Sequence, residues 1–334
     1  MKAIKYVLAL VLAGGLMTAC DNDIENIEVQ KPLTYSDQYY QNLRDYKASE
    51  HSIAFMWFAQ YGAQNSMAVR FNGLPDSLDI CSLWGGIPST ENKQIWEDLR
   101  FTQKVKGTKM LVVAITRIDA ETDEKPFKQH YNKAKQMEPG EAREAAIDKA
   151  IEEYAEYFLD QVFLNDLDGF DADYEPEGDF LSGDRFVKFY KHLALYLGPN
   201  PEQAPGERLK LIQERYGKDF TDVNKLLCVD SPGGGPIACE PYSNYCFFQN
   251  YGGGTGHGSW PVEKSVFTEN VGDNWGGNLS GMYGQARWQP SDGKRKGGFG
   301  AFFGHRDYNI VPGSNPQPYH RFRECIQIQN PAVY

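Results

Sequence analysis

The sequence predicts an α/β fold, a (β/α)8 TIM barrel, and three observations support this prediction. Eight strand-like segments alternate with helical patterns along the chain, as in a barrel of β-α units. Several of these segments are nearly continuous apolar runs, which is typical of parallel strands covered on both faces. The length of 334 residues also suits one barrel. The expected strands are residues 51–61, 77–85, 109–117, 167–175, 226–231, 245–251, 265–270 and 298–304.

The expected helices follow from apolar residues that recur every three or four positions. The clearest begins after the Pro-Gly pair at 139–140 and carries one apolar stripe over residues 146–162. Ser36 is placed to cap a short helix that ends near Lys47. Further helical patterns cover residues 183–197, 279–289 and 319–329.

The second half of the barrel is expected to be irregular. Eighteen of the 33 glycines lie between Gly233 and Gly304, and glycine disfavours helices. We therefore predict short or missing helices after strands five and six, and a long insertion over residues 198–225 before strand five. Glycine-rich loops at the strand ends would leave an open trough suited to an extended ligand.

The overall charge of the chain excludes one class of partner. The formal net charge is −11 at pH 7, and so acidic a surface repels nucleic-acid phosphates and anionic lipid heads. No nucleic-acid partner is therefore expected. The hydrophobic and aromatic fractions, 41% and 13%, exclude a disordered chain. We further expect the protein to be a monomer.

The cysteine and histidine spacings do not indicate a metal site. No cysteines are spaced Cys-x-x-Cys and no His-Glu-x-x-His occurs, so a zinc site is not indicated. Cys81 and Cys228 lie in apolar runs and are expected to be buried thiols. Cys239 and Cys246 flank a short turn-like stretch and could form a disulfide.

Three carboxylates alternate along the fourth expected strand. Residues 168–175 read Asp-Gly-Phe-Asp-Ala-Asp-Tyr-Glu, and alternate side chains of a strand share one face, so Asp171, Asp173 and Glu175 point together. In a barrel that face is the interior, and Glu175 lies nearest the C-terminal mouth, where barrel enzymes carry out their chemistry. Three such carboxylates must share a proton, and a raised pKa on Glu175 would suit a general acid. Burying them without a function would be costly.

Three other interpretations of this run fit less well. An EF-hand with Gly169 at its sixth position would need a ligand at Leu164, whose side chain cannot supply one. A phosphotransfer Asp-x-Asp motif requires Thr or Val where Glu175 stands. A Mg²⁺ or Ca²⁺ site on the three carboxylates stays open as an alternative.

The run matches the Asp-Gly-x-Asp-x-Asp-x-Glu signature of glycoside hydrolase family 18, and the chain resembles members of the endo F type from Bacteroidetes, which are endo-β-N-acetylglucosaminidases. Residues 249–251 read Gln-Asn-Tyr at the end of the sixth expected strand, where the endo F type carries Gln-x-Tyr and chitinases carry Met-x-Tyr-Asp. Two departures separate the chain from chitinases. Residues 114–117 read Ala-Ile-Thr-Arg instead of Ser-x-Gly-Gly, and Phe302 and Phe303 stand where many members place a tryptophan as the floor of the sugar subsite.

This resemblance implies a retaining mechanism in which the N-acetyl group of the substrate is the nucleophile. Glu175 would protonate the glycosidic oxygen and then activate water. Asp173 would hold the acetamido N–H, and Asp171 would tune Asp173. Tyr251 and Gln249 would align the acetamido group. No cofactor is implied, and the expected partners are N-glycans or glycoproteins. The alternatives are a chitinase-like hydrolase and a non-catalytic glycan-binding lipoprotein.

Four further residues are candidates for substrate binding. Trp275, in a Trp-Gly-Gly run, is expected to be a platform for a sugar ring. Glu269 and Asn270 end the seventh expected strand and should point toward the mouth, and Phe303 could supply the floor of the subsite. The remaining tryptophans considered are expected in the core: Trp57, Trp84, Trp260 and Trp288.

The first twenty residues resemble an export signal. Lys2 and Lys5 precede an apolar run over residues 6–19 that is too short to span a bilayer. The residues before Cys20 resemble a bacterial lipoprotein cleavage box, and the acidic run after it resembles a Bacteroidetes surface-export tag. We therefore expect a signal peptide over 1–19, a lipid-anchored tether and short helix over 20–48, and one catalytic barrel over 49–334. The protein would be a cell-surface or outer-membrane lipoprotein that touches the membrane only through its anchor. The alternative is an ordinary signal peptide with Cys20 as a free thiol.

Overall fold

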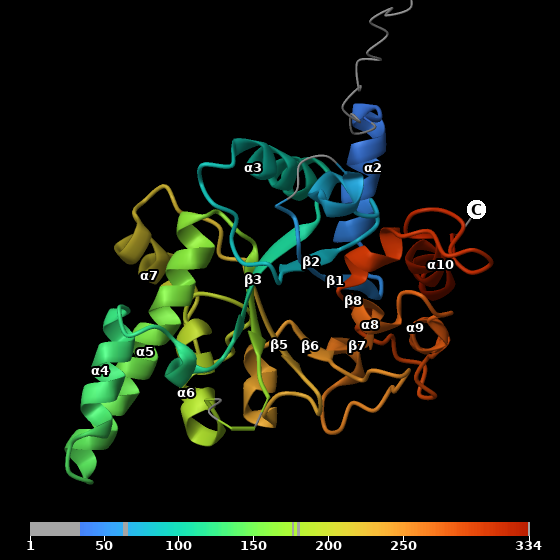
Figure 1. Cartoon of the computed structure of the whole chain (residues 1–334). Helices are drawn as coiled ribbons and strands as arrows, with labels where there is room; N and C mark the ends of the chain where they lie inside the picture. The colour runs from blue at the N-terminus through green and yellow to red at the C-terminus, as the bar shows by residue number, and fades with distance from the viewer. Residues whose placement is uncertain (1–33, 63–65, 176, 179–180, 333–334) are drawn as a thin grey trace, which may run out of the picture. The chain divides into compact units, whose positions relative to one another are not determined.

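The computed structural model describes residues 34–62, 66–175, 177–178 and 181–332. The predicted signal peptide, the lipidated Cys20 and most of the tether lie outside the described residues and stay predictions. Eight parallel strands close into a barrel in chain order (Figure 1), which confirms the predicted (β/α)8 TIM barrel. The strands are β1 Ile53–Phe58, β2 Ile80–Leu83, β3 Lys109–Ile115, β4 Gly169–Asp173, β5 Leu226–Ser231, β6 Tyr245–Phe248, β7 Ser265–Asn270 and β8 Gly298–Phe302.

All eight strands lie within the segments expected from the sequence, and the helices agree in part. Ser36 caps α2 as predicted, since its side chain accepts a hydrogen bond from the backbone N–H of Tyr39. Helices that were not predicted are α3, α4, α8 and, inside the insertion before β5, α7. Helix α7 buries only Ile212, so the sequence carries no apolar stripe that would indicate it. The helices are α2 Asp37–Ala48, α3 Lys93–Arg100, α4 Pro126–Lys135, α5 Glu141–Leu164, α6 Gly183–Leu193, α7 Glu207–Tyr216, α8 Val271–Asn274, α9 Ser280–Arg287 and α10 His320–Gln329.

The barrel is irregular after β5 and β6, as the sequence predicts. The segments that follow these two strands hold 3-10 turns, η5 Ile237–Tyr242 and η6 Val262–Lys264, in place of α-helices. The helices α4 to α6 lie on the side of β3 to β5, and α8 to α10 lie on the side of β7 and β8 (Figure 1).

Aromatic side chains pack inside the barrel. Phe55 of β1 stacks on Phe247 of β6, with ring centroids 3.6 Å apart. Gly300 of β8 makes room for this stack, because a Cβ at that position would lie 2.8 Å from the ring of Phe55. The interior is therefore a filled core and not a pore.

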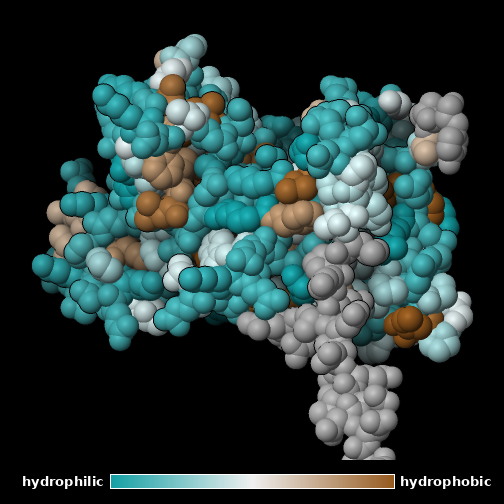
Figure 2. Space-filling model, turned by 90° about the horizontal axis from the view of Figure 1, so that it is seen from above, coloured by the Kyte–Doolittle hydropathy of each residue, from teal (hydrophilic) through white to brown (hydrophobic). Residues whose placement is uncertain are grey.

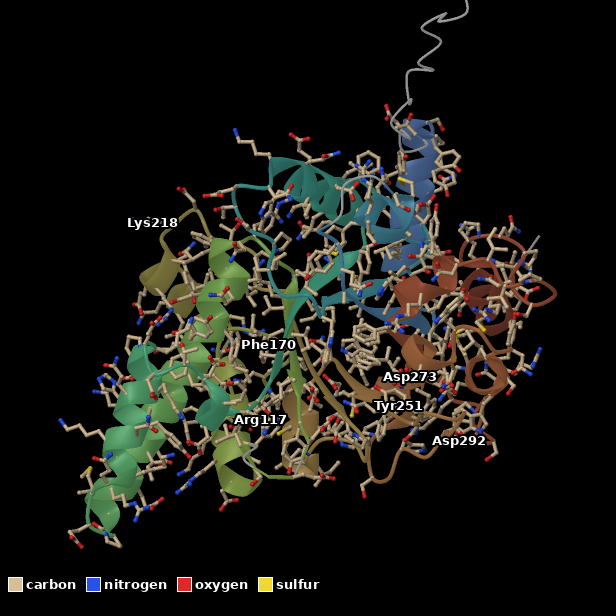
Figure 3. The ribbon with its side chains drawn as sticks, in the orientation of Figure 1. Arg117, Phe170, Lys218, Tyr251, Asp273 and Asp292 are labelled. Atoms are coloured by element: carbon tan, nitrogen blue, oxygen red, sulfur yellow. The ribbon has the colours of Figure 1, made fainter. Side chains whose placement is uncertain are left out.

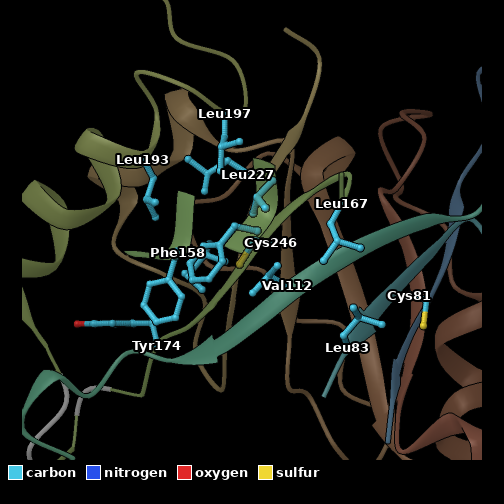
Figure 4. Close-up of a cluster of buried hydrophobic side chains, with 14 of the residues drawn as sticks. Cys81, Leu83, Val112, Phe158, Leu167, Tyr174, Leu193, Leu197, Leu227 and Cys246 are labelled. Atoms are coloured by element: carbon cyan, nitrogen blue, oxygen red, sulfur yellow. The ribbon is translucent and has the colours of Figure 1, made fainter. Parts of the chain in front are cut away.

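A second apolar layer lies between the strands and the outer helices (Figure 4). Phe170 and Ala172 of β4 belong to this layer, and Phe158 of α5 packs on Phe170 with centroids 4.8 Å apart. Because side chains alternate along a strand, this contact directs Asp171 and Asp173 into the barrel.

The cysteines of the described residues are all free and buried. Cys81 and Cys228 are buried thiols, as predicted. The possible disulfide between Cys239 and Cys246 is wrong, because both are free thiols. Cys246 lies on β6 in the outer apolar layer (Figure 4), and Cys239 lies in η5.

One face of the molecule shows how polar and apolar side chains are distributed over it. Seen from above, it is mainly hydrophilic, and its apolar groups are small and separate (Figure 2). Among the described residues, no helix combines the length and the apolar character that crossing a membrane requires.

Candidate active site

The carboxylates of β4 point into the C-terminal end of the barrel, as the alternation predicts. Asp171 and Asp173 are 0% and 2% exposed, whereas Glu175 is half-buried just beyond the strand. The backbone here is held from both neighbouring strands. Thr116 donates its hydroxyl to the carbonyl of Asp173 at 2.7 Å, and the N–H of Tyr174 donates to the carbonyl of Asp230 at 2.8 Å. These bonds fix the position from which Glu175 extends.

Asp171 is anchored by two donors that the sequence analysis did not single out. Trp57 Nε1 and Ser82 Oγ donate to its Oδ2 at 3.0 Å and 2.7 Å, while its Oδ1 has no donor. Burial raises the pKa of Asp171 to about 7, with the Ser82 hydrogen bond opposing the rise and the charge of Asp173 adding to it. Trp57 was expected in the core. It is buried, but its indole N–H faces the carboxylate row.

A further carboxyl, Asp230, joins this row from β5. It is fully buried and lies in register with Asp173 of β4. Gln249 Nε2 donates to Asp230 Oδ1 at 2.6 Å and to Asp173 Oδ1 at 3.3 Å, so one amide bridges the two carboxyls. Burial, followed by the charges of Asp173 and Asp171, raises the pKa of Asp230 well above its ordinary value. Burial and the charge of Glu175 raise that of Asp173 to about 7.

Sequence reasoning missed Asp230, although a signal was present. It is the last residue but one of an expected strand, and its side chain points to the same face as that of Cys228. The two residues pair in register with Asp173 and Asp171. That register is a property of the sheet and cannot be taken from β5 alone.

Gln249 and Tyr251 follow the end of β6 and lie on the same side of the chain as Phe247, which faces the barrel interior. Gln249 is held by its own N–H, which donates to the carbonyl of Ser231 at 3.0 Å. Tyr251 is 40% exposed, so its ring is available at the mouth. Burial and the charges of Asp230 and Asp173 raise the pKa of Tyr251 above its ordinary value, so it keeps its hydroxyl proton. The structure therefore brings together the five residues predicted to be catalytic.

Glu269 does not point to the mouth as the sequence analysis expected. Its side chain points to the same face of β7 as that of Phe267, which packs in the outer apolar layer, and it is 3% exposed. Its carboxylate instead accepts the N–H of Gly252 at 3.0 Å and that of Asn270 at 2.8 Å. From the other side Gln285 of α9 donates to the carbonyls at 250 and 254. The two side chains together hold the loop that carries Tyr251.

Asn270 and Trp275 lie at the end of β7. Asn270 accepts the N–H of Asp273 at 3.0 Å and so caps α8. Trp275 follows α8 and is 37% exposed. Its carbonyl accepts a hydrogen bond from Arg321, which is fully buried and paired with Asp307 at 2.7 Å. Trp275, the predicted platform for a sugar ring, thus lies in a loop that a buried ion pair holds in place.

An aromatic cluster closes the interior at the mouth, with Phe302 at its centre. Phe302 lies 5.2 Å from Trp84, 6.0 Å from Trp57 and 6.1 Å from Tyr251, measured between ring centroids. Phe303, which the sequence analysis favoured for the floor, stacks on Phe302 at 4.2 Å. Of the two, Phe302 contacts the tyrosine at the site directly.

The residues at the strand ends gather at one end of the barrel. Figure 3 labels Arg117 and Tyr251, which follow β3 and β6, below Phe170 of β4.

A hollow of about 470 Å³ lies beside the β3 and β4 loops, lined by Asp119, Tyr131 and Arg185 among others. A larger hollow of about 830 Å³ lies at the opposite end, beside residues that precede β1 and β8. Barrel enzymes use the C-terminal end, so the carboxylates and not the larger volume locate the site.

The arrangement supplies an accessible acid and, behind it, buried carboxyls that accept hydrogen bonds. Glu175 can exchange a proton with a ligand at the mouth. Asp173 can accept an N–H or balance a positive charge beside it. The described residues hold no group of three or more histidine, cysteine, aspartate or glutamate side chains arranged to bind a metal ion.

The sequence profile of glycoside hydrolase family 18, BT1044-like, matches residues 19–272. The chain belongs to glycoside hydrolase family 18. This glycoside hydrolase is 26% identical over 379 residues to endo-β-N-acetylglucosaminidase F2 of Elizabethkingia meningoseptica, in an alignment that covers 99% of the chain and 100% of the relative. The resemblance noted from the sequence is thereby confirmed at the level of the family.

Two solved structures share the fold of this family 18 hydrolase. A variant of BT1044 is 21% identical with a TM-score of 0.62, and the match covers 90% of this chain and 94% of that one. An endo-β-N-acetylglucosaminidase mutant from Cordyceps militaris, in complex with fucosyl-N-acetylglucosamine-Asn, is 20% identical with a TM-score of 0.59. That match covers 90% and 98% of the two chains.

Proposed function

We propose that this hydrolase is an endo-β-N-acetylglucosaminidase that cleaves the GlcNAc-β-1,4-GlcNAc chitobiose core of N-glycans with retention of configuration. The observation that carries the proposal is the row Asp171, Asp173 and Glu175, joined at the mouth by Gln249 and Tyr251. Support comes from the relatives, because one carries this activity in its name and another binds fucosyl-N-acetylglucosamine-Asn.

In the proposed reaction the substrate supplies its own nucleophile. Glu175 donates its proton to the glycosidic oxygen as the bond to the anomeric carbon breaks. The oxygen of the 2-acetamido group attacks that carbon and forms an oxazolinium ion. The carboxylate of Glu175 then takes a proton from water, which opens the oxazolinium ion and restores the N-acetyl group.

Asp173 is the partner of the acetamido N–H, whose positive charge grows as the oxazolinium ion forms. Its carboxylate is aimed by the bridging amide of Gln249. Asp171, held by Trp57 and Ser82, stands behind it. Tyr251, partly exposed beside these carboxyls, can donate its hydroxyl to the acetamido oxygen and align it for attack.

The test is hydrolysis of glycoproteins that carry defined high-mannose or complex N-glycans, with the products identified by mass spectrometry. The wild-type chain should leave a single GlcNAc on each asparagine. Glu175→Gln should lower the rate on the order of 10²–10⁴-fold while glycan binding persists. Glu177→Gln is a matched control, because this exposed residue lies in the same loop and should keep the wild-type rate.

Two other outcomes would favour the alternatives. Turnover of chitin oligosaccharides with intact N-glycans would favour a chitinase-like hydrolase. Binding of glycans by both proteins with no product from either would favour a non-catalytic glycan-binding lipoprotein.

The predicted lipid anchor is part of the same proposal. A monomeric enzyme held at the cell surface through Cys20 would meet glycoproteins outside the cell. The anchor is tested by expressing wild type and Cys20→Ala in the native host. Membrane association that survives in Cys20→Ala would contradict it.

A further inference from the structure

Asp230 is a buried carboxyl that the proposed reaction does not use. It lies beside Asp173 in register and within hydrogen-bonding reach of both carboxyls of β4. All three groups are almost completely shielded from water, with exposures of 0%, 2% and 0% for Asp171, Asp173 and Asp230. Placing a third carboxyl here is costly unless it carries a proton.

The supply of hydrogen-bond donors to the three carboxyls is unequal. Asp171 receives two, from Trp57 and Ser82, whereas Asp173 and Asp230 share the single amide of Gln249. Two oxygens have no donor at all, Oδ1 of Asp171 and Oδ2 of Asp230. One proton held on a carboxyl of this cluster would supply the missing donor.

The groups that face Asp230 offer no positive charge. From β4 it faces Asp171 and Asp173, on its own strand Cys228, and from the loop after β6 Tyr251. The thiol of Cys246, on the outer face of β6, lies close enough to interact electrostatically and also carries no positive charge. Among the described residues, no lysine, arginine or histidine forms a salt bridge with the three aspartates. A proton is therefore the available means of neutralising part of this charge.

The proton is best placed on Asp230. Asp171 is better able to bear a charge, because two donors already stabilise its carboxylate. Asp173 lies nearest Glu175 and the mouth, where a substrate N–H would bring it a further donor. Asp230 is fully buried and has one donor, so its charged form is the least stabilised of the three.

We propose that Asp230 is a positioning residue that holds the shared proton and donates it to the β4 carboxylates, so that Asp173 keeps its negative charge for the substrate. This inference rests on the proposed function for its consequence in turnover. The location of the proton is independent of turnover. In the proposed reaction no bond to Asp230 forms or breaks, and its proton stays within the cluster.

The first test is the pH dependence of kcat/KM for Asp230→Asn and Asp230→Ala. On the acidic side of the profile, kcat/KM falls as Asp173 becomes protonated, and this part of the curve is called the acid limb. Asparagine keeps a neutral donor of the same shape, so the midpoint of the acid limb should stay within about 0.3 pH unit of wild type. Alanine removes a charge-assisted hydrogen bond, so that limb should move up by roughly one unit and kcat should fall roughly tenfold at neutral pH. Cys228→Ala is the matched control, because it is a buried interior residue of the same strand and should lower stability without moving the limb.

Two results of this test would overturn the inference. A downward shift of about one unit in Asp230→Asn would mean that Asp230 is ionised in the wild type. An unmoved limb in Asp230→Ala would mean that its role is only to fill space.

The second test needs no substrate. A protonated carboxyl has an infrared C=O stretch that carboxylates lack, and Asp230→Asn should remove one such band at neutral pH while Cys228→Ala retains it. If the wild type hydrolyses none of the glycans tested, the proposed function fails, and this band still decides where the proton lies. A band unchanged in Asp230→Asn would overturn the inference.

Discussion

Replacing Asp171 by asparagine should stabilise the protein at pH 8 and leave its stability nearly unchanged at pH 4. In the unfolded chain this carboxyl has its ordinary pKa of 3.8, whereas burial raises the pKa to about 7 in the folded protein. Between these values the folded state binds a proton that the unfolded state has lost. The free energy of unfolding of the wild type therefore falls as the pH rises through this window, and the stabilising proton is fully present only below it.

The size of the effect follows from the pKa difference. One pKa unit corresponds to about 1.4 kcal/mol, so ionising Asp171 in the fold costs up to about 4 kcal/mol. Asparagine never ionises. Its oxygen can keep the donors Trp57 and Ser82, and its amide would supply a donor at the position of the unsatisfied Oδ1. We expect Asp171→Asn to be more stable by about 2–4 kcal/mol at pH 8, with most of the turnover lost.

The measurement is urea unfolding of both proteins at pH 4, 6 and 8, followed by tryptophan fluorescence. The difference in the free energy of unfolding should grow with pH. Glu97→Gln, at an exposed position of α3, should show a small difference that does not grow. A difference for Asp171→Asn that stays constant, or that shrinks as the pH rises, would refute the reasoning.

Three further predictions concern the residues that support the site. Gln285→Leu removes the donors that hold the 250–254 loop, so kcat/KM should fall on the order of tenfold with an unchanged circular dichroism spectrum; a wild-type rate would contradict this role. Tyr251→Phe removes one hydroxyl at the mouth and should lower kcat roughly 10²-fold with little change in KM, measured by steady-state kinetics. Arg321→Met leaves the buried Asp307 without its partner and should cost about 3–5 kcal/mol in chemical denaturation; a loss below about 1 kcal/mol, typical of surface pairs, would contradict this.

The sequence was informative wherever the relevant information is local. Alternation along one strand is a two-residue period of the backbone, so it places Asp171, Asp173 and Glu175 together without knowledge of any other strand. The same period places Gln249 and Tyr251 on one side of the chain. The apolar runs located all eight strands because both faces of a barrel strand are covered.

The sequence-based prediction failed where it had to decide which residues of a strand face the barrel interior. Glu269 and Asn270 are adjacent, and adjacent side chains of a strand point to opposite faces. Packing of Phe267 against the outer layer sets which of them faces inward. α7 escaped detection because it buries one residue, so the hydrophobic pattern that reveals other helices is missing.

The sequence by itself thus determined the fold class, the family and the row of carboxylates that lies on one strand. The tertiary structure decided what surrounds that row: Trp57 and Ser82 from β1 and β2, Asp230 from β5, and the frame that Glu269 and Gln285 build around the loop of Tyr251. The physical reason is that these residues meet through the register between strands and the packing of α9 on the barrel. Register and packing depend on contacts between segments tens to hundreds of residues apart, and no local period of the chain records them.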